Sequence, residues 1–319
     1  MRKVLLATTA LVALGGVSVA SADISISVSN EMKYSSWSDN TASTTSNNSS
    51  VTNDSTVKIS ASTVLDNGLS MSSYAANDTT TGFDDFGFSI SGDFGTIGVK
   101  GSESGDAFAT AADVTADEGH SILAATMTAA ANAFVMPADE SVEASDVSYL
   151  SPDINGFQFA IGMADTGGYS DDSSMGAQYS MTSGDASVTV KYASSEQGVA
   201  TSGNDAIEAT SLGLVIGYGD ATVTVSQNTK KKGSSYDYTG DAVGVTYAMS
   251  DVMTLQAYTG TTEDAKDSAH EISDTGLGLT YTITPGLSLS ITHNDVDLKD
   301  TDATNQNSEK TTLAINLTF

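Results

Sequence analysis

Apolar and polar residues alternate along most of this chain with a period of two. Near the start, Ile24, Ile26 and Val28 are separated by Ser25 and Ser27. Successive side chains of a strand point to opposite faces, so this alternation predicts β-strands with one apolar face each. The same pattern returns in residues 57–61, 86–90, 157–163, 175–181, 212–218, 243–249, 277–283, 287–291 and 313–319.

The links between these strands alternate in length. The short links contain turn-forming residues, such as Asp66-Asn67-Gly68 and Pro285-Gly286, and suit tight hairpins. The pattern predicts an all-β fold, a sixteen-stranded antiparallel transmembrane β-barrel with short turns on one rim. The predicted long links, rich in Ser, Thr, Asn and Asp, are 36–54, 78–84, 102–146, 165–173, 195–206, 229–238, 262–271 and 294–308.

A secreted β-sandwich is the main alternative to a barrel. The second face of the strands is rich in Ser, Thr, Gly, Asp and Lys, and a dry core would leave such groups unpaired at roughly 2–7 kcal/mol each. A water-filled lumen avoids that penalty. Lys33, Lys58, Lys100 and Lys191 all fall on the polar face, as expected if the other face meets lipid.

The first residues predict export. A basic Met1-Arg2-Lys3, an apolar run to Val19 and a small-residue site at Ala20-Ser21-Ala22 are typical of a signal peptide spanning 1–22. Residues 23–319 would then form the barrel in the outer membrane of a Gram-negative cell.

Charge and cysteine content narrow the function. Of 12 basic residues, Arg2 and Lys3 lie in 1–22, so residues 23–319 hold ten lysines against 40 acidic residues, a formal net charge of −30. Such a surface repels nucleic acid. The chain contains no cysteine, which excludes disulfides and thiolate metal sites.

Two stretches carry a family resemblance. Gly92-Asp-Phe-Gly-Thr-Ile-Gly-Val-Lys-Gly101 and Val147-Ser-Tyr-Leu-Ser-Pro-Asp-Ile-Asn-Gly-Phe157, together with the terminal Phe319, resemble the Gram-negative general porins, in particular the acidic alphaproteobacterial type. The resemblance implies a homotrimer in which the third loop, 102–146, folds into each pore. It also implies that Phe319 closes the last strand against the first. One departure is Gly101-Ser102, where relatives often carry an arginine.

The loop 102–146 contains the candidate constriction. A link this long is usually functional, and its carboxylates would face lysines across the lumen. The alternative is that most of these acids are merely solvated loop charges. Close carboxylates such as Asp171-Asp172 or Asp84-Asp85 could hold a structural Ca²⁺, without any EF-hand spacing; no other cofactor is expected. The candidate constriction residues are Glu103, Asp106, Asp113, Asp117, Glu118, Lys33, Lys58 and Lys100.

These observations favour a passive diffusion channel for small hydrophilic solutes and ions, with a preference for cations. A surface adhesin or purely structural barrel is one alternative. A rim-site hydrolase is another, and would need a base from His120, His270 or His293, the last followed by Asn294 and Asp295. Expected partners are outer-membrane lipid and lipopolysaccharide, whose phosphates Lys230-Lys231-Lys232 could meet from an outer link, although a solvated charge run is the simpler interpretation.

Overall fold

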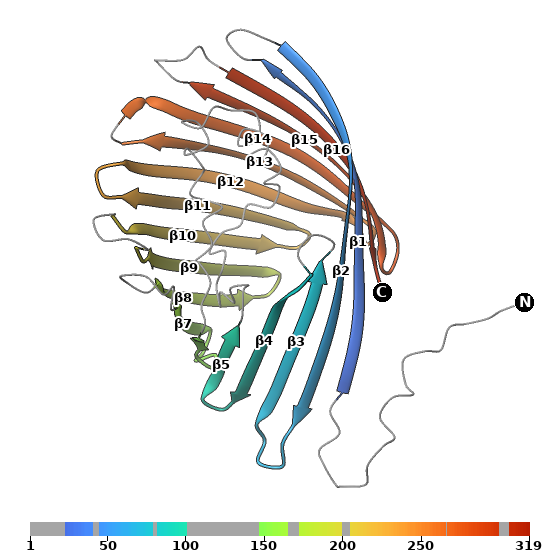
Figure 1. Cartoon of the computed structure of the whole chain (residues 1–319), viewed down its shortest axis with the longest axis vertical. Helices are drawn as coiled ribbons and strands as arrows, with labels where there is room; N and C mark the ends of the chain where they lie inside the picture. Colours follow the sequence, from blue (N-terminus) through green and yellow to red (C-terminus); the bar gives the residue numbers. More distant parts are fainter. Residues whose placement is uncertain are drawn as a thin grey trace, which may run out of the picture.

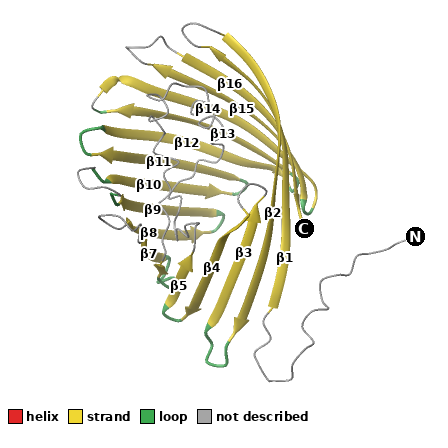
Figure 2. Cartoon of the chain, in the orientation of Figure 1, coloured by secondary structure: helices red, strands yellow, loops and turns green. Residues whose placement is uncertain are grey.

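The structure is a computed structural model that describes residues 23–40, 45–78, 82–100, 147–164, 172–199, 205–265, 267–299 and 306–319. Every regular element in these ranges is a strand (Figure 2). The strands are β1 (Asp23–Asn40), β2 (Thr45–Val64), β3 (Ser70–Asp78), β4 (Gly82–Gly92), β5 (Gly95–Lys100), β6 (Val147–Leu150), β7 (Phe157–Ala164), β8 (Asp172–Ser183), β9 (Ala186–Gln197), β10 (Ile207–Tyr218), β11 (Ala221–Lys232), β12 (Tyr236–Ser250), β13 (Met253–Asp264), β14 (Asp267–Thr284), β15 (Leu287–Lys299) and β16 (Gln306–Thr318). No helix among the described residues is long and apolar enough to cross a membrane.

The sixteen strands form one closed antiparallel barrel, which confirms the predicted fold class (Figure 1). Each strand pairs with its neighbours in sequence, and β16 returns to pair with β1. Beyond β16, the Phe319 N–H donates to the Val28 carbonyl at 2.9 Å, and the Val28 N–H donates to the Phe319 carbonyl at 3.2 Å. Closure leaves no edge strand available for pairing with another chain.

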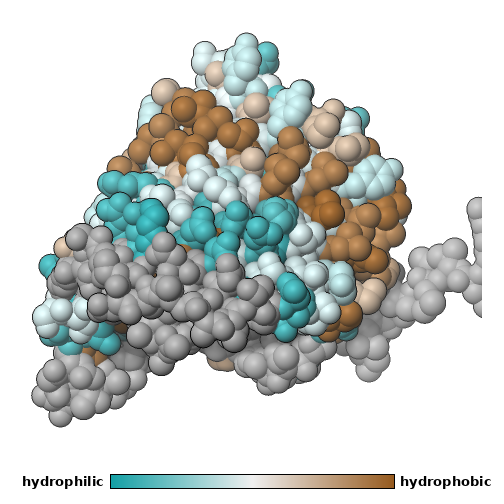
Figure 3. Space-filling model, turned by 90° about the horizontal axis from the view of Figure 1, so that it is seen from above, coloured by the Kyte–Doolittle hydropathy of each residue, from teal (hydrophilic) through white to brown (hydrophobic). Residues whose placement is uncertain are grey.

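The two faces of the barrel differ in chemistry as the alternation predicts. The outward positions carry exposed apolar side chains, for example Ile26, Phe88 and Leu212. Broad hydrophobic patches, separate from hydrophilic groups, are visible on the molecular surface in Figure 3. The inward positions are largely polar; buried examples are Ser35, Ser226, Asn228, Thr262 and Thr312.

The outer ends of β14 and β15 depart from this rule. There the inward side chains of Ile272, Val296 and Leu298 are 0–3% exposed, so the lumen side carries a small apolar cluster. On the opposite, outward face, Asp297 and Glu271 occupy positions where a membrane-embedded strand would have apolar residues. The strands therefore continue past the apolar band into the aqueous region.

Several predicted long links were wrong in length. The 36–54 link is replaced by strand on both sides, because β1 runs to Asn40 and β2 starts at Thr45. The 229–238 link shortens to residues 233–235 between β11 and β12, and the 262–271 link is mostly strand. The periodic apolar signal ends at the membrane boundary, but backbone pairing needs no apolar side chain and continues into water.

Glycine is required at particular turns. Gly95 has a φ of +103°, and a Cβ there would lie 2.2 Å from the Leu150 carbonyl oxygen. Gly286 has a φ of +83°, and a Cβ there would lie 2.4 Å from the Thr318 carbonyl oxygen. L-residues rarely adopt such φ values, so these glycines allow tight turns against neighbouring strands.

Candidate functional site: the lumen wall

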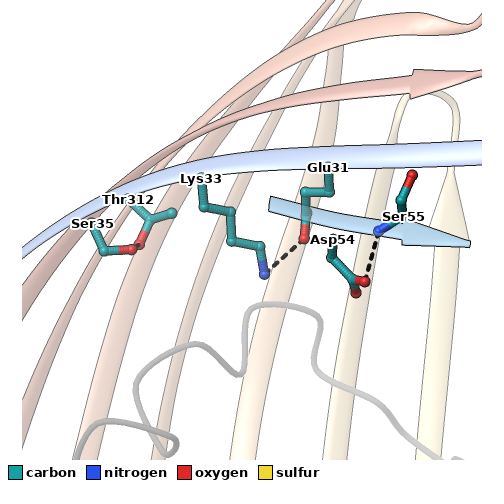
Figure 4. Close-up of polar contacts among 6 residues, drawn as sticks. All are labelled: Glu31, Lys33, Ser35, Asp54, Ser55 and Thr312. Carbon is teal, nitrogen blue, oxygen red and sulfur yellow. Dashed lines mark hydrogen bonds and ion pairs between the residues drawn. The ribbon is translucent and has the colours of Figure 1, made fainter. Parts of the chain in front are cut away.

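The lumen wall formed by β1 and β2 carries a mixed-charge group. The Lys33 ammonium lies 2.9 Å from a Glu31 carboxylate oxygen, two residues away on the same face of β1. Asp54 of β2 is directly opposite Glu31 in the register, so both carboxylates face the lumen beside Lys33 (Figure 4). The Lys33 and Glu31 side chains are 29% and 35% exposed, so both meet the water of the lumen.

Side-chain hydrogen bonds join β1 and β16 on the lumen side. The Ser35 and Thr312 hydroxyls lie 3.0 Å apart in a buried contact (Figure 4). Nearer the outer end, the Ser308 hydroxyl donates to Asp39 Oδ1 at 2.7 Å, also buried. These bonds reinforce the backbone pairing at the position where the first and last strands meet.

Lys58, the second predicted pore lysine, is held against an aromatic ring. Its ammonium lies 4.2 Å from the centroid of the Tyr74 ring on β3, a cation–π contact. Lys100 ends β5 and is opposite Gly87, which places it on the lumen parity; its side chain is outside the described part of the structure.

Lysines and carboxylates divide unequally between the two faces of the barrel. Carboxylates beyond the apolar band gather on the outer face, among them Glu208, Asp237, Asp241, Glu263, Glu271, Asp297 and Glu309. The lysines on the lumen parity are Lys33, Lys58, Lys100, Lys191, Lys230, Lys232 and Lys310. Since Glu31 and Asp54 also face the lumen, the described lumen wall carries both signs and is not a uniformly negative surface.

The structure leaves the loop part of the predicted constriction untested. Glu103, Asp106, Asp113, Asp117 and Glu118 lie outside the described residues, so their position across from the lysines stays a prediction. Sequence reasoning placed Lys33 and Lys58 on the polar face. It missed Glu31 and Asp54 as pore-wall residues, although Glu31 shares the parity of Lys33 in the sequence.

Other predicted sites have mixed outcomes. Among the described residues, no group of three or more acidic or imidazole side chains could hold a metal ion. The side chains of Asp84, Asp85 and Asp171 are not described, so a Ca²⁺ site there stays a prediction. The run Lys230-Lys231-Lys232 is not in an outer link: it ends β11 and alternates between the two faces, so it forms no single patch.

The structure separates His293 from Asn294, one of the pairs that a rim-site hydrolase was expected to use. His293 faces outward and its Nδ1 lies 3.0 Å from the Thr311 hydroxyl. Asn294 faces the lumen, where its amide donates to the Tyr258 hydroxyl at 2.7 Å. The His293 and Asn294 side chains are on opposite faces of β15 and cannot act together on one substrate, whereas Asp295 shares the outward face of His293.

A closed barrel with an apolar exterior and a polar, charged lumen is typical of outer-membrane channel proteins. The chain belongs to the Gram-negative porin family, whose sequence profile matches residues 7–301. The protein is therefore an outer-membrane β-barrel that crosses the membrane many times, and its family and fold point to a channel and not to an enzyme.

Solved structures share the fold at low sequence identity. An anion-selective porin from Comamonas acidovorans has a TM-score of 0.63 and 14% identity, covering 93% of this chain and 100% of that one. A porin refined at 1.8 Å resolution has a TM-score of 0.61 and 18% identity over 93% and 100% of the two chains. The trimer form of OmpT from Vibrio cholerae has a TM-score of 0.64 and 12% identity over 93% and 99%. No curated protein matches the sequence.

Proposed function

We propose that this porin is a passive, cation-preferring diffusion channel for small hydrophilic solutes and ions. The observation that carries the proposal is the lumen wall of β1 and β2. There Glu31 partly neutralises Lys33 at 2.9 Å, and Asp54 adds a second carboxylate at the same level. Where Lys33 is balanced in this way, the charge of loop 102–146 gains weight in deciding the sign of the selectivity.

That loop supplies the net negative charge. Residues 102–146 contain nine acidic residues and no lysine or arginine. A narrow passage with low-dielectric walls concentrates the field of fixed charges, so carboxylates there would enrich cations. The candidates with this role are Glu103, Asp106, Asp113, Asp117 and Glu118, facing Lys33, Lys58 and Lys100.

The proposal includes a homotrimer, in keeping with the trimer form of OmpT, which shares the fold. Outer-membrane lipid and lipopolysaccharide would surround the apolar exterior, and no cofactor is needed for diffusion. A surface adhesin or structural barrel is less well supported, because neither role requires charged side chains on the lumen wall.

The test is a planar-bilayer measurement on purified protein in a KCl gradient. The expected result is ohmic conductance with a reversal potential that favours K⁺ over Cl⁻ and that weakens at high salt, since the Debye length is about 10 Å at 0.1 M. Replacing Glu103, Asp106 and Asp113 together by their amides should reduce the preference. Absence of conductance would refute the channel, and anion preference in the unmodified protein would refute its proposed selectivity.

A further inference from the structure

Two tyrosines on the lumen parity lie across glycines of the next strand. A Cβ added to Gly87 of β4 would lie 2.5 Å from Cε1 of Tyr74. A Cβ added to Gly276 of β14 would lie 2.0 Å from Cε1 of Tyr258. Real Cβ atoms do not approach so closely, so each ring occupies the space that a side chain on the neighbouring strand would fill.

The Tyr258 ring crosses the whole width of β14. In the register, Tyr258 of β13 is opposite Gly276 of β14, and Gly276 is opposite Asn294 of β15. The Tyr258 hydroxyl reaches that far strand and accepts a hydrogen bond from the Asn294 amide at 2.7 Å. Because strands are about 4.8 Å apart, a ring that spans from β13 to β15 must lie nearly flat on the wall.

A second bond fixes the same hydroxyl. Tyr258 donates to Asp274 Oδ2 at 2.9 Å, and Asp274 is the lumen-facing residue of β14 two positions before Gly276. Asp274 and Asn294 are 0% and 1% exposed, so their positions are set by close packing. The Tyr258 hydroxyl therefore accepts from Asn294 and donates to Asp274, both closely packed, while its ring lies over Gly276.

A side chain at position 276 would occupy the space in which the Tyr258 ring now lies. The sheet backbone closes the outward direction, and the packed side chains of Asp274 and Asn294 limit sideways motion. The direction left for a displaced ring is toward the lumen axis, where it would narrow the path of solutes.

We infer that Gly276, Asp274 and Asn294 are size-determining positions of this channel, because they hold Tyr258 flat against the wall and out of the solute path. The inference rests on the proposed function, since it concerns the width of a diffusion channel. The solute class affected is the larger hydrophilic molecules near the exclusion limit. Gly87 has the same relation to Tyr74, whose ring also contacts Lys58.

The test compares two alanine substitutions on the same strand and face. Gly276→Ala should lower single-channel conductance and slow the entry of larger neutral sugars into liposomes more than that of small ones. Gly278→Ala is the matched control, because a Cβ there would make ordinary contacts, with Thr292 Cγ2 at 3.4 Å, Gln256 Oε1 at 3.6 Å and Gln256 Cβ at 3.8 Å. It should conduct like the unmodified protein. Equal conductance in both variants and the unmodified channel would overturn the inference.

A second comparison, in protein that lacks the Tyr258 ring, tests whether the effect of Gly276→Ala passes through that ring. Tyr258→Ala should conduct at least as well as the unmodified channel, and adding Gly276→Ala to it should change nothing. A loss of conductance that persists without the ring would overturn the inference, because the effect would then not pass through Tyr258.

If Gly276→Ala fails to assemble, a second variant tests the inference: Tyr258→Phe keeps the ring but removes both hydrogen bonds of the hydroxyl. We expect Tyr258→Phe to conduct less than Tyr258→Ala, and equal conductance of the two would count against the inference. Absence of conductance in the unmodified protein would instead refute the proposed function.

Discussion

Replacing Glu31 by glutamine changes the charge of the lumen wall with little change of shape. In the native wall the Glu31 carboxylate lies 2.9 Å from the Lys33 ammonium, and both side chains are partly exposed to the lumen. Glu31→Gln removes the negative partner while Lys33 keeps its charge. The wall therefore becomes more positive, and we expect the preference for cations to fall.

The size of the effect follows from Coulomb's law in water. A unit charge about 4 Å from a passing ion contributes about 1 kcal/mol when the effective dielectric constant is near 80. Since about 1.4 kcal/mol corresponds to a factor of ten, the loss of this charge should disfavour K⁺ and favour Cl⁻ by up to about fivefold each. The K⁺ to Cl⁻ permeability ratio should therefore fall by up to about 25-fold at low salt. Folding should hardly change, because an exposed ion pair contributes roughly 0.2–1 kcal/mol.

The assay is the reversal potential in a KCl gradient, repeated at several salt concentrations. Lys33→Gln should shift the ratio in the opposite direction, toward cations. Glu309→Gln is the matched control, because Glu309 is an exposed acid on the outer face of β16. The reasoning fails if Glu309→Gln moves the ratio as much as Glu31→Gln does, since distance from the lumen would then not matter.

Three further predictions concern assembly and stability. Ser35→Ala removes a buried hydroxyl contact of 3.0 Å with Thr312 and should lower the free energy of unfolding by about 0.5–1.5 kcal/mol in urea titrations, whereas Ser36→Ala on the outer face should not. Gly95→Ala should lower the free energy of unfolding by about 1–3 kcal/mol, because φ is +103° there. Gly184→Ala is the control and should be tolerated better, because φ is +59° and an added Cβ would have nothing within 4 Å. Equal losses in the two variants would contradict the steric argument. Deleting Phe319 removes both backbone bonds to Val28 and should slow assembly in the outer membrane; normal yield and rate in pulse–chase labelling would refute this role.

The sequence predicts the barrel well because a membrane imposes a simple rule on every strand. Outward residues must be apolar, so Ile24, Ile26 and Val28 show the strand, its face and its period together. The rule stops at the membrane boundary. The strand ends at Asn40, Thr45 and Asp264 lie in water, where polar residues serve in strands and loops alike, so their positions could not be predicted from hydropathy.

The lumen wall was predictable only in part. Parity placed Lys33 on the correct face, but the partner of a charge depends on register between strands. Asp54 belongs to the predicted link 36–54 and is opposite Glu31 because β2 already begins at Thr45, and the sequence gives no direct signal of that register. The position of Tyr258 over Gly276 has the same cause, since a tyrosine on β13 and a glycine on β14 are unrelated until the strands are aligned.

The distribution of charge shows why net charge alone is a poor guide to the selectivity of a pore. An ion in the lumen responds mainly to charges within about a Debye length, roughly 10 Å at 0.1 M salt, and exposed charges farther away are screened. Glu208, Glu263 and Glu309 are on the outer face, so they contribute to the formal charge of −30 but little to the field in the lumen. Lys33 and Lys58, in contrast, face the lumen directly. The sign of selectivity therefore depends on a few carboxylates close to these lysines, among them Glu31, which lies 2.9 Å from Lys33.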